Sequence, residues 1–126
     1  MPTPLETVTA MTDAMAVKDY DAACRHFAAD CEYTNIPIGT VSGPEGVRAV
    51  LEPFFAPTIE NEFIVLRSAV QGNTVFVERL DRHRLADKWV ELPVTGVFEV
   101  KDGRIAVWRD YFDRATLMTH WPQPGA

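Results

Sequence analysis

The hydrophobic pattern of the chain changes from helical to strand-like near residue 57. Residues 5, 8, 11 and 15 are apolar, and this spacing predicts a helix over residues 5–17. Asp19 is a favourable capping residue, which predicts a second, short helix over residues 20–27. The sequence Gly43-Pro44-Glu45 is typical of a helix start, and the apolar residues after it predict a third helix up to Phe55.

Strands are predicted in most of the remaining chain. Residues 31–37 form a short β-rich segment that ends at Pro37, before a turn at Gly39. Four further β-rich segments cover residues 59–70, 74–85, 88–100 and 104–112, with turn residues between them. Such a series predicts an antiparallel meander. Because helices precede strands, we expect an α+β fold with helices over one face of a strongly curved β-sheet.

Charged residues interrupt one apolar strand face. Alternate side chains of a strand share a face, so the segment 74–85 directs one set to the same side: Val75, Val77, Arg79, Asp81 and His83. In the last strand, Asp110 shares a face with aromatic residues, Trp108 and Phe112. Whether these two faces meet depends on the turn between the last two strands.

Two registers are possible at that turn. A two-residue loop, Asp102-Gly103, would place Asp110 opposite Thr95. A three-residue loop with Gly103 left-handed would place Asp110 opposite Val94 and join it to an almost wholly apolar surface: Val90, Leu92, Val94, Phe98, Val100, Trp108 and Phe112. Register follows the hydrophobic pattern, so we predict the three-residue loop.

This arrangement directs two aspartates and an arginine into an apolar concavity. Isolated buried charges are costly, so the three groups should be paired. Arg79 can bridge two carboxylates while one of them keeps a proton, which would hold a base beside an acid at neutral pH. The pattern is equally compatible with an Arg79–Asp81 pair that stabilises the sheet and an Asp110 in solvent.

Composition restricts the class of protein. The 126 residues are 47% hydrophobic and 24% charged, as expected for one globular domain over residues 1–126. A TIM barrel or a full two-half Rossmann domain is too large for this length. The net charge of −6 argues against a nucleic-acid or anionic-membrane partner. No apolar run is long enough to span a membrane.

The start of the chain, the cysteines and the histidines predict no further reactive or metal-binding site. The start, Met1-Pro2-Thr3-Pro4, has no features of a signal peptide, so we expect a cytoplasmic protein with free thiols at Cys24 and Cys31. The histidines are scattered, and no metal site is predicted. The opposite sheet face is too apolar to remain in water, which predicts a homodimer through the sheet: Trp89, Pro93, Val97, Ile105, Val107 and Tyr111.

Three ordered motifs resemble the limonene-1,2-epoxide hydrolase family of NTF2-like (SnoaL-like) domains. They are Tyr33-Thr34-Asn35-Ile36-Pro37, Glu78-Arg79-Leu80-Asp81, and the segment 96–113, which contains Trp108-Arg109-Asp110-Tyr111-Phe112-Asp113. The resemblance runs from the first helix to about Phe112. It implies an NTF2-like cone with N-terminal helices on a mixed, mostly antiparallel sheet.

The resemblance also implies roles for five residues in a one-step opening of a small lipophilic, terpene-like or cyclic, epoxide to a vicinal diol. Asp110 would be the base that takes a proton from water, and Tyr33 and Asn35 would position that water. Asp81 would protonate the epoxide oxygen, and Arg79 would bridge the two carboxylates. The family needs neither cofactor nor metal for this reaction.

The substrate-binding residues expected around this site are His83, Leu92, Val94, Phe98, Trp108 and Phe112. His83 departs from the family pattern, which favours an aliphatic residue there. It could be a hydrogen-bonded core histidine, or it could polarise the pocket and shift substrate preference. Asp113 is expected to cap a turn over residues 115–119. Two alternative functions remain: a ketosteroid-isomerase-like or polyketide-cyclase-like proton transfer, and a non-catalytic small-molecule-binding module.

Overall fold

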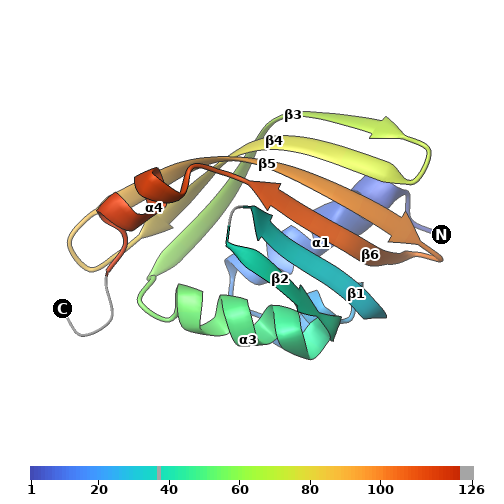
Figure 1. Ribbon diagram of the computed structural model, residues 1–126, viewed down its shortest axis with the longest axis horizontal. Helices are drawn as coiled ribbons and strands as arrows, with labels where there is room; N and C mark the ends of the chain where they lie inside the picture. Colours follow the sequence, from blue (N-terminus) through green and yellow to red (C-terminus); the bar gives the residue numbers. More distant parts are fainter. Residues whose placement is uncertain (37, 123–126) are drawn as a thin grey trace.

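A single curved sheet organises the protein, as the computed structural model of residues 1–36 and 38–122 shows (Figure 1). Within these described residues the sheet has six strands in the order β2-β1-β6-β5-β4-β3. The strands are β1 (Phe27–Ile36), β2 (Gly39–Ser42), β3 (Glu60–Gln71), β4 (Thr74–Arg84), β5 (Trp89–Lys101) and β6 (Arg104–Tyr111). Strands β3 to β6 form the predicted antiparallel meander, and β1 joins β6 in parallel. The predicted α+β class and mixed sheet are confirmed.

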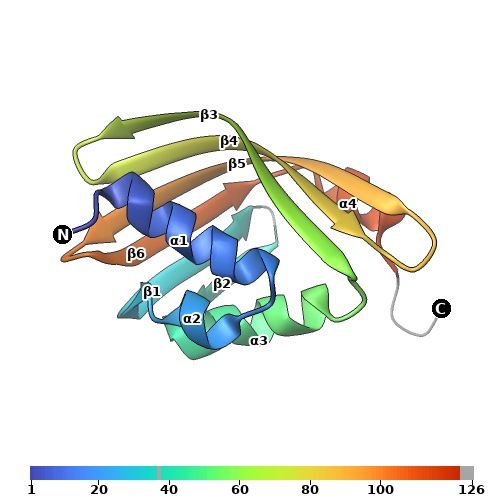
Figure 2. The same ribbon diagram turned by 180° about the vertical axis from the view of Figure 1, so that it is seen from behind.

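Three helices cover the concave side of the sheet, and a fourth follows the last strand (Figures 1 and 2). They are α1 (Pro4–Ala16), α2 (Tyr20–Cys24), α3 (Gly43–Phe55) and α4 (Arg114–His120). Two predicted caps are present, because Asp19 accepts a hydrogen bond from the Ala22 amide and Asp113 accepts one from the Thr116 amide. Helix α1 packs its buried side chains against one end of the sheet. Helices α3 and α4 and the other end of the sheet line a cavity.

The elements predicted between residues 20 and 42 need three corrections. The second helix ends at Cys24, not at residue 27, because Phe27 already pairs with Ile105 as the first residue of β1. Strand β1 therefore begins four positions before Cys31. The short strand β2 was not predicted, because its four residues show no apolar alternation. Pro37, predicted to end the first strand, lies outside the described residues.

The register of β5 and β6 differs from the prediction. Asp102 and Gly103 both have positive φ, 52° and 77°, so they form a two-residue turn, and the predicted three-residue loop is wrong. Val100 pairs with Ile105 but Glu99 pairs with Val107, which leaves Ala106 as an extra residue, a β-bulge.

The bulge decides which side chains of β6 face the concave side. Beyond it, Asp110 pairs with Gly96 rather than Val94, yet still shares the concave face with Trp108. Before it, Ile105 also turns inward and is fully buried, so its predicted place on the outer face is wrong. One extra residue thus reverses the alternation and restores the expected face for Asp110.

Two further sequence predictions concern membrane-spanning helices and the cysteines. Among the described residues, no helix has the length and apolar character needed to cross a membrane. Cys24 and Cys31 are both free thiols, as expected.

Gly96 occupies the point where β5 passes beneath Asp110. A Cβ at this position would lie 2.8 Å from Arg79 Nη1 and 3.0 Å from Asp110 Oδ1. Both distances are at or below the closest approach of real Cβ atoms, and both atoms belong to buried side chains. A glycine is therefore needed here for space, not for backbone conformation.

We predict that Gly96→Ala lowers the free energy of unfolding by about 1–3 kcal/mol, because the added methyl group must displace a buried charged side chain. Urea unfolding measures this change. The matched control is Gly39→Ala in β2, where an added Cβ meets nothing within 4 Å and stability should change by less than about 0.5 kcal/mol. Equal stabilities of the two variants would contradict the prediction.

Candidate active site

A cavity of about 230 Å³ opens between the sheet and helices α3 and α4. This volume is far above the roughly 10–15 Å³ that one water needs, so the cavity can hold an organic molecule. Its wall is mostly apolar. Six polar side chains converge on it from β1, β4 and β6: Tyr33, Asn35, Arg79, Asp81, His83 and Asp110.

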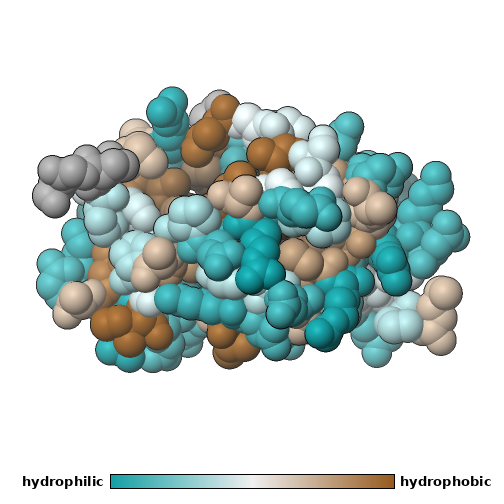
Figure 3. All heavy atoms as spheres, turned by 90° about the horizontal axis from the view of Figure 1, so that it is seen from below, coloured by the Kyte–Doolittle hydropathy of each residue, from teal (hydrophilic) through white to brown (hydrophobic). Residues whose placement is uncertain are grey.

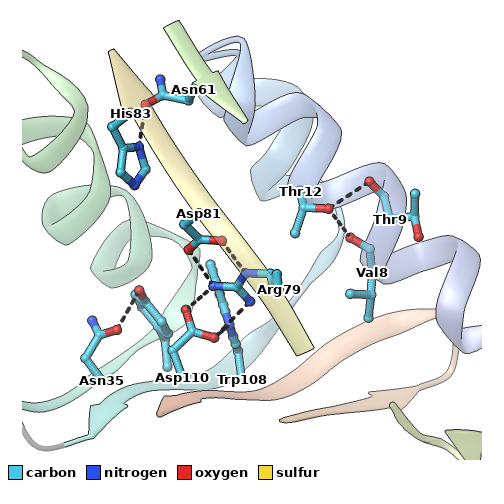
Figure 4. A network of polar contacts seen from close by, with 11 residues as sticks. Val8, Thr9, Thr12, Asn35, Asn61, Arg79, Asp81, His83, Trp108 and Asp110 are labelled. Carbon is cyan, nitrogen blue, oxygen red and sulfur yellow. Dashed lines mark hydrogen bonds and ion pairs between the residues drawn. The ribbon is translucent and has the colours of Figure 1, made fainter. Parts of the chain in front are cut away.

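Arg79 connects the two aspartates at the base of the cavity (Figure 4). Its Nε and Nη2 donate to the two oxygens of Asp81 at 2.7 and 3.0 Å. Its Nη1 and Nη2 donate to the two oxygens of Asp110 at 3.1 and 2.8 Å. All three side chains are buried, with exposed fractions of 3–8%. One guanidinium thus forms a fork to each carboxylate, as the sequence pattern suggested.

Burial favours a proton on one of these carboxylates. Arg79 supplies one positive charge for two carboxylates, so a neutral cluster requires one protonated aspartate. Burial raises the pKa of Asp81, and the Asp110 charge adds to this effect, although the bonds from Arg79 oppose it. Asp81 therefore has the character of an acid.

Asp110 has a second donor that the sequence did not reveal. The indole Nε1 of Trp108 donates to Asp110 Oδ1 at 2.7 Å. The two residues lie two positions apart on β6 and share its concave face, which makes this contact possible. Trp108 also stacks on Tyr33 with ring centroids 4.1 Å apart. Trp108 is thus both cavity wall and a fixed donor to Asp110.

Parallel pairing of β1 with β6 brings the Tyr33–Asn35 pair to the aspartates. Asn35 is the register partner of Asp110, and Tyr33 is the partner of Trp108. The Tyr33 hydroxyl donates to Asn35 Oδ1 at 3.0 Å. Burial, followed by the Asp110 charge, raises the pKa of Tyr33, so its phenol stays protonated. The five residues named from sequence therefore meet in one place.

The predicted wall residues divide into two groups. Leu92, Val94, Trp108 and Phe112 line the cavity, as does His83. Phe98 does not line it. That ring is fully buried beneath Trp108, with centroids 5.5 Å apart, and belongs to the core.

Sequence reasoning missed the part of the wall that comes from helices. Phe54 of α3 and Trp121, just after α4, stack with centroids 4.2 Å apart and nearly parallel rings. Both line the cavity. The sequence suggested only that Phe54 lies on an apolar helix face, and it assigned nothing to Trp121. No local signal relates the two, because the fold alone brings α3 and α4 together.

His83 is a buried, neutral histidine at the cavity wall. Its Nδ1 lies 2.7 Å from Asn61 Oδ1, and its exposed fraction is 2%. Burial, followed by the Arg79 charge, lowers the pKa of His83 to about 4. Among the described residues, no group of three or more His, Cys, Asp or Glu side chains could hold a metal ion.

This histidine should make the protein less stable in acid. Its pKa is about 4 when folded and 6.5 ordinarily, so the unfolded chain binds more protons between these values. Stability from His83 is therefore full above pH 6.5 and is lost as pH falls towards 4, by roughly 3 kcal/mol. Asp81, whose pKa is raised, acts in the opposite direction, so wild type must be compared with His83→Leu.

We predict that, over this pH range, wild type loses roughly 3 kcal/mol more of its unfolding free energy than His83→Leu does. Urea unfolding at several pH values measures the difference, and Asp81 contributes equally to both proteins. Parallel pH profiles for the two proteins would contradict the buried neutral state of His83.

Known proteins share this fold. In a search of solved structures, an LEH-like epoxide hydrolase of Mycobacterium tuberculosis matches with a TM-score of 0.80 and 29% identity, covering 92% of this chain and 86% of that one. An NTF2-like protein from Cytophaga hutchinsonii matches with a TM-score of 0.76 and 19% identity, covering 94% and 96% of the two chains. The second match shows the fold alone, which is NTF2-like.

Sequence comparison gives a more specific result. Epoxide hydrolase EphG of Mycobacterium tuberculosis is 32% identical over 106 residues, which cover 84% of this chain and 70% of EphG. The model of the limonene-1,2-epoxide hydrolase catalytic domain matches residues 2–123. This match covers nearly the whole chain and includes Arg79, Asp81 and Asp110. The chain belongs to the limonene-1,2-epoxide hydrolase family.

Proposed function

We propose that this protein hydrolyses a small lipophilic epoxide, terpene-like or cyclic, to a vicinal diol in one step without a covalent intermediate. The observation that carries the proposal is the buried fork of Arg79 between two carboxylates, beside the Tyr33–Asn35 pair and inside an apolar cavity. Such a cavity accepts a lipophilic molecule and leaves a few polar groups to act on it.

Asp110, Tyr33 and Asn35 form the water side of the proposed reaction. Water would donate one hydrogen bond to Asp110 and the other to the Tyr33 oxygen, whose own hydrogen points to Asn35. The Asn35 amide nitrogen would donate to the water oxygen. One lone pair of the water then remains for attack on the ring carbon, and the bound orientation lowers the entropic barrier.

Asp81 forms the acid side. As the water oxygen bonds to carbon, the carbon–oxygen bond of the ring breaks, and Asp81 gives its proton to the departing oxygen. Asp110 takes the proton of the attacking water. The products are a diol, a protonated Asp110 and an ionised Asp81, and transfer of one proton from Asp110 to Asp81 restores the starting state. Attack from the face opposite the breaking bond inverts that carbon.

The Tyr33–Asn35 pair favours hydrolysis over the alternative functions. An isomerase or cyclase on this fold also needs a carboxylate in an apolar cavity, but it has no water to position. A binding module would have no need for two buried carboxylates joined by one arginine, because burial of such groups is costly.

We predict that Asp110→Asn and Asp81→Asn each reduce kcat for epoxide opening by about 10²–10⁴-fold, because each variant removes one proton-transfer group. Diol formation is measured with limonene, cyclohexene and styrene oxides. The matched control is Asp87→Asn, an exposed turn residue, which should retain wild-type rates.

A single turnover with excess enzyme in ¹⁸O-water tests the one-step route. Direct attack places solvent oxygen in the diol, whereas an ester intermediate on aspartate would place unlabelled carboxylate oxygen there. Unlabelled diol, or full activity of either aspartate variant, would overturn the proposed mechanism.

We also propose a homodimer that packs through the outer face of the sheet. Apolar side chains form continuous rows across this face, because Ile64, Leu80 and Pro93 are cross-strand neighbours and Phe76 pairs with Val97. By contrast, the helical side seen in Figure 3 is mostly hydrophilic, with its hydrophobic residues in small separate patches. These apolar rows alternate with rows of paired charges, such as Arg67 with Glu78, and such a mixed face supports a symmetric partner of the same kind.

Light scattering at micromolar concentration should give a mass of about twice 14.1 kDa. Phe76→Glu introduces a charge in the outer face and should shift the mass to that of a monomer. Val65→Glu is the control, because Val65 is exposed but pairs with Arg79 and so points to the other side of β3. A monomeric wild type would end this proposal.

A further inference from the structure

The protonation of His83 is fixed by a chain of hydrogen bonds that leads away from the cavity. The Thr58 hydroxyl donates to the carbonyl oxygen of Phe55 at 2.7 Å, since a carbonyl can only accept. The Thr58 oxygen therefore accepts the hydrogen bond from Asn61 Nδ2 at 3.0 Å. Asn61 Nδ2 also faces the Ala16 carbonyl at 3.4 Å, which supports the same amide orientation.

This orientation determines the tautomer of the imidazole. Asn61 directs its Oδ1, which can only accept, at His83 Nδ1 over 2.7 Å (Figure 4). Nδ1 must therefore carry the hydrogen. Because the ring is neutral, Nε2 has a lone pair and no hydrogen.

The lone pair of Nε2 can accept a hydrogen bond from a ligand in the cavity. His83 lines the cavity wall and is surrounded by the rings of Phe54, Phe55, Phe63 and Trp121, with centroids 5.1–6.2 Å away. Among the hydrogen bonds of the described residues, none involves Nε2, yet no fully buried side-chain nitrogen or oxygen there lacks a partner. Nε2 is therefore open to the cavity that His83 lines. An acceptor among aromatic rings is unfavourable unless a donor reaches it, and an aliphatic residue would fill this wall without that penalty.

We propose that His83 Nε2 is a binding subsite for a hydroxyl group of the substrate, so that the preferred epoxides carry a hydroxyl several carbons away from the ring. The inference rests on the proposed epoxide hydrolysis and names its substrate class. Asp81 and His83 project from the same face of β4, separated by about 7 Å along the strand. The ring oxygen at Asp81 and the hydroxyl at His83 would thus lie at opposite ends of one ligand.

The surroundings of His83 Nε2 favour an uncharged hydrogen-bond donor on the ligand. An ammonium group would lose its hydration among aromatic rings and would lie near the positive charge of Arg79, which already acts on His83. A hydroxyl group supplies a hydrogen without a charge. The remainder of such a ligand would be hydrocarbon, which matches the apolar wall.

The test compares ω-hydroxy-1,2-epoxyalkanes of increasing chain length with their methyl ethers, which cannot donate. We expect wild type to favour the alcohol at the best length by about tenfold or more in kcat/KM, the effect of one buried hydrogen bond. In His83→Leu the ratio of alcohol to ether should fall to about one or below. No preference in wild type at any length, or a preference retained in His83→Leu, would overturn the proposal.

A second measurement does not depend on turnover. ¹⁵N NMR of the His83 ring should show a protonated Nδ1 and an unprotonated Nε2, and a simple alcohol such as heptan-1-ol should move the Nε2 signal whereas its methyl ether should not. A protonated Nε2, or equal responses to both probes, would contradict the subsite even if the variant failed to fold. If no epoxide is hydrolysed but the alcohol shifts Nε2, the proposed function fails and the subsite stands.

Discussion

The contact of one guanidinium with two buried carboxylates is the constraint on which the rest of the site depends. A single buried carboxylate would be neutral, and a buried pair without a cation would repel. Arg79 holds both at hydrogen-bond distance, while burial raises the pKa of Asp81. The proposed role of Asp81 as an acid therefore needs an apolar cavity as much as it needs the polar groups, because water around Asp81 would return its pKa to the ordinary range.

The sheet meets this constraint through small local features. The bulge at Ala106 returns Asp110 to the concave face after a tight two-residue turn has set the opposite alternation. Gly96 then leaves the space that the Arg79–Asp110 pair occupies. Parallel pairing with β1 adds Asn35 beside Asp110, so residues from three strands meet at one point.

Period-two alternation explains why much of the site could be predicted from sequence. On β4 it requires only that Arg79, Asp81 and His83 share a face with buried valines. The register at Asp110 could not be predicted in the same way, because a bulge at a small residue leaves no mark in the apolar pattern. The meeting of Asn35 with Asp110 depends on parallel pairing of distant segments, so it came only from the family resemblance. Trp121 was missed because no local rule relates the end of the chain to Phe54 of α3.

His83 shows how a buried polar residue differs from an ordinary core position. Its Nδ1 is satisfied by Asn61, and that residue is held in turn by Thr58 and the backbone. A histidine needed only for packing could be satisfied at both nitrogens or replaced by an aliphatic side chain. Here the series of hydrogen bonds begins at the Phe55 carbonyl inside the protein and ends at the His83 ring, which lines the cavity. The same network that keeps the ring in place therefore also determines that the cavity receives an acceptor and not a donor.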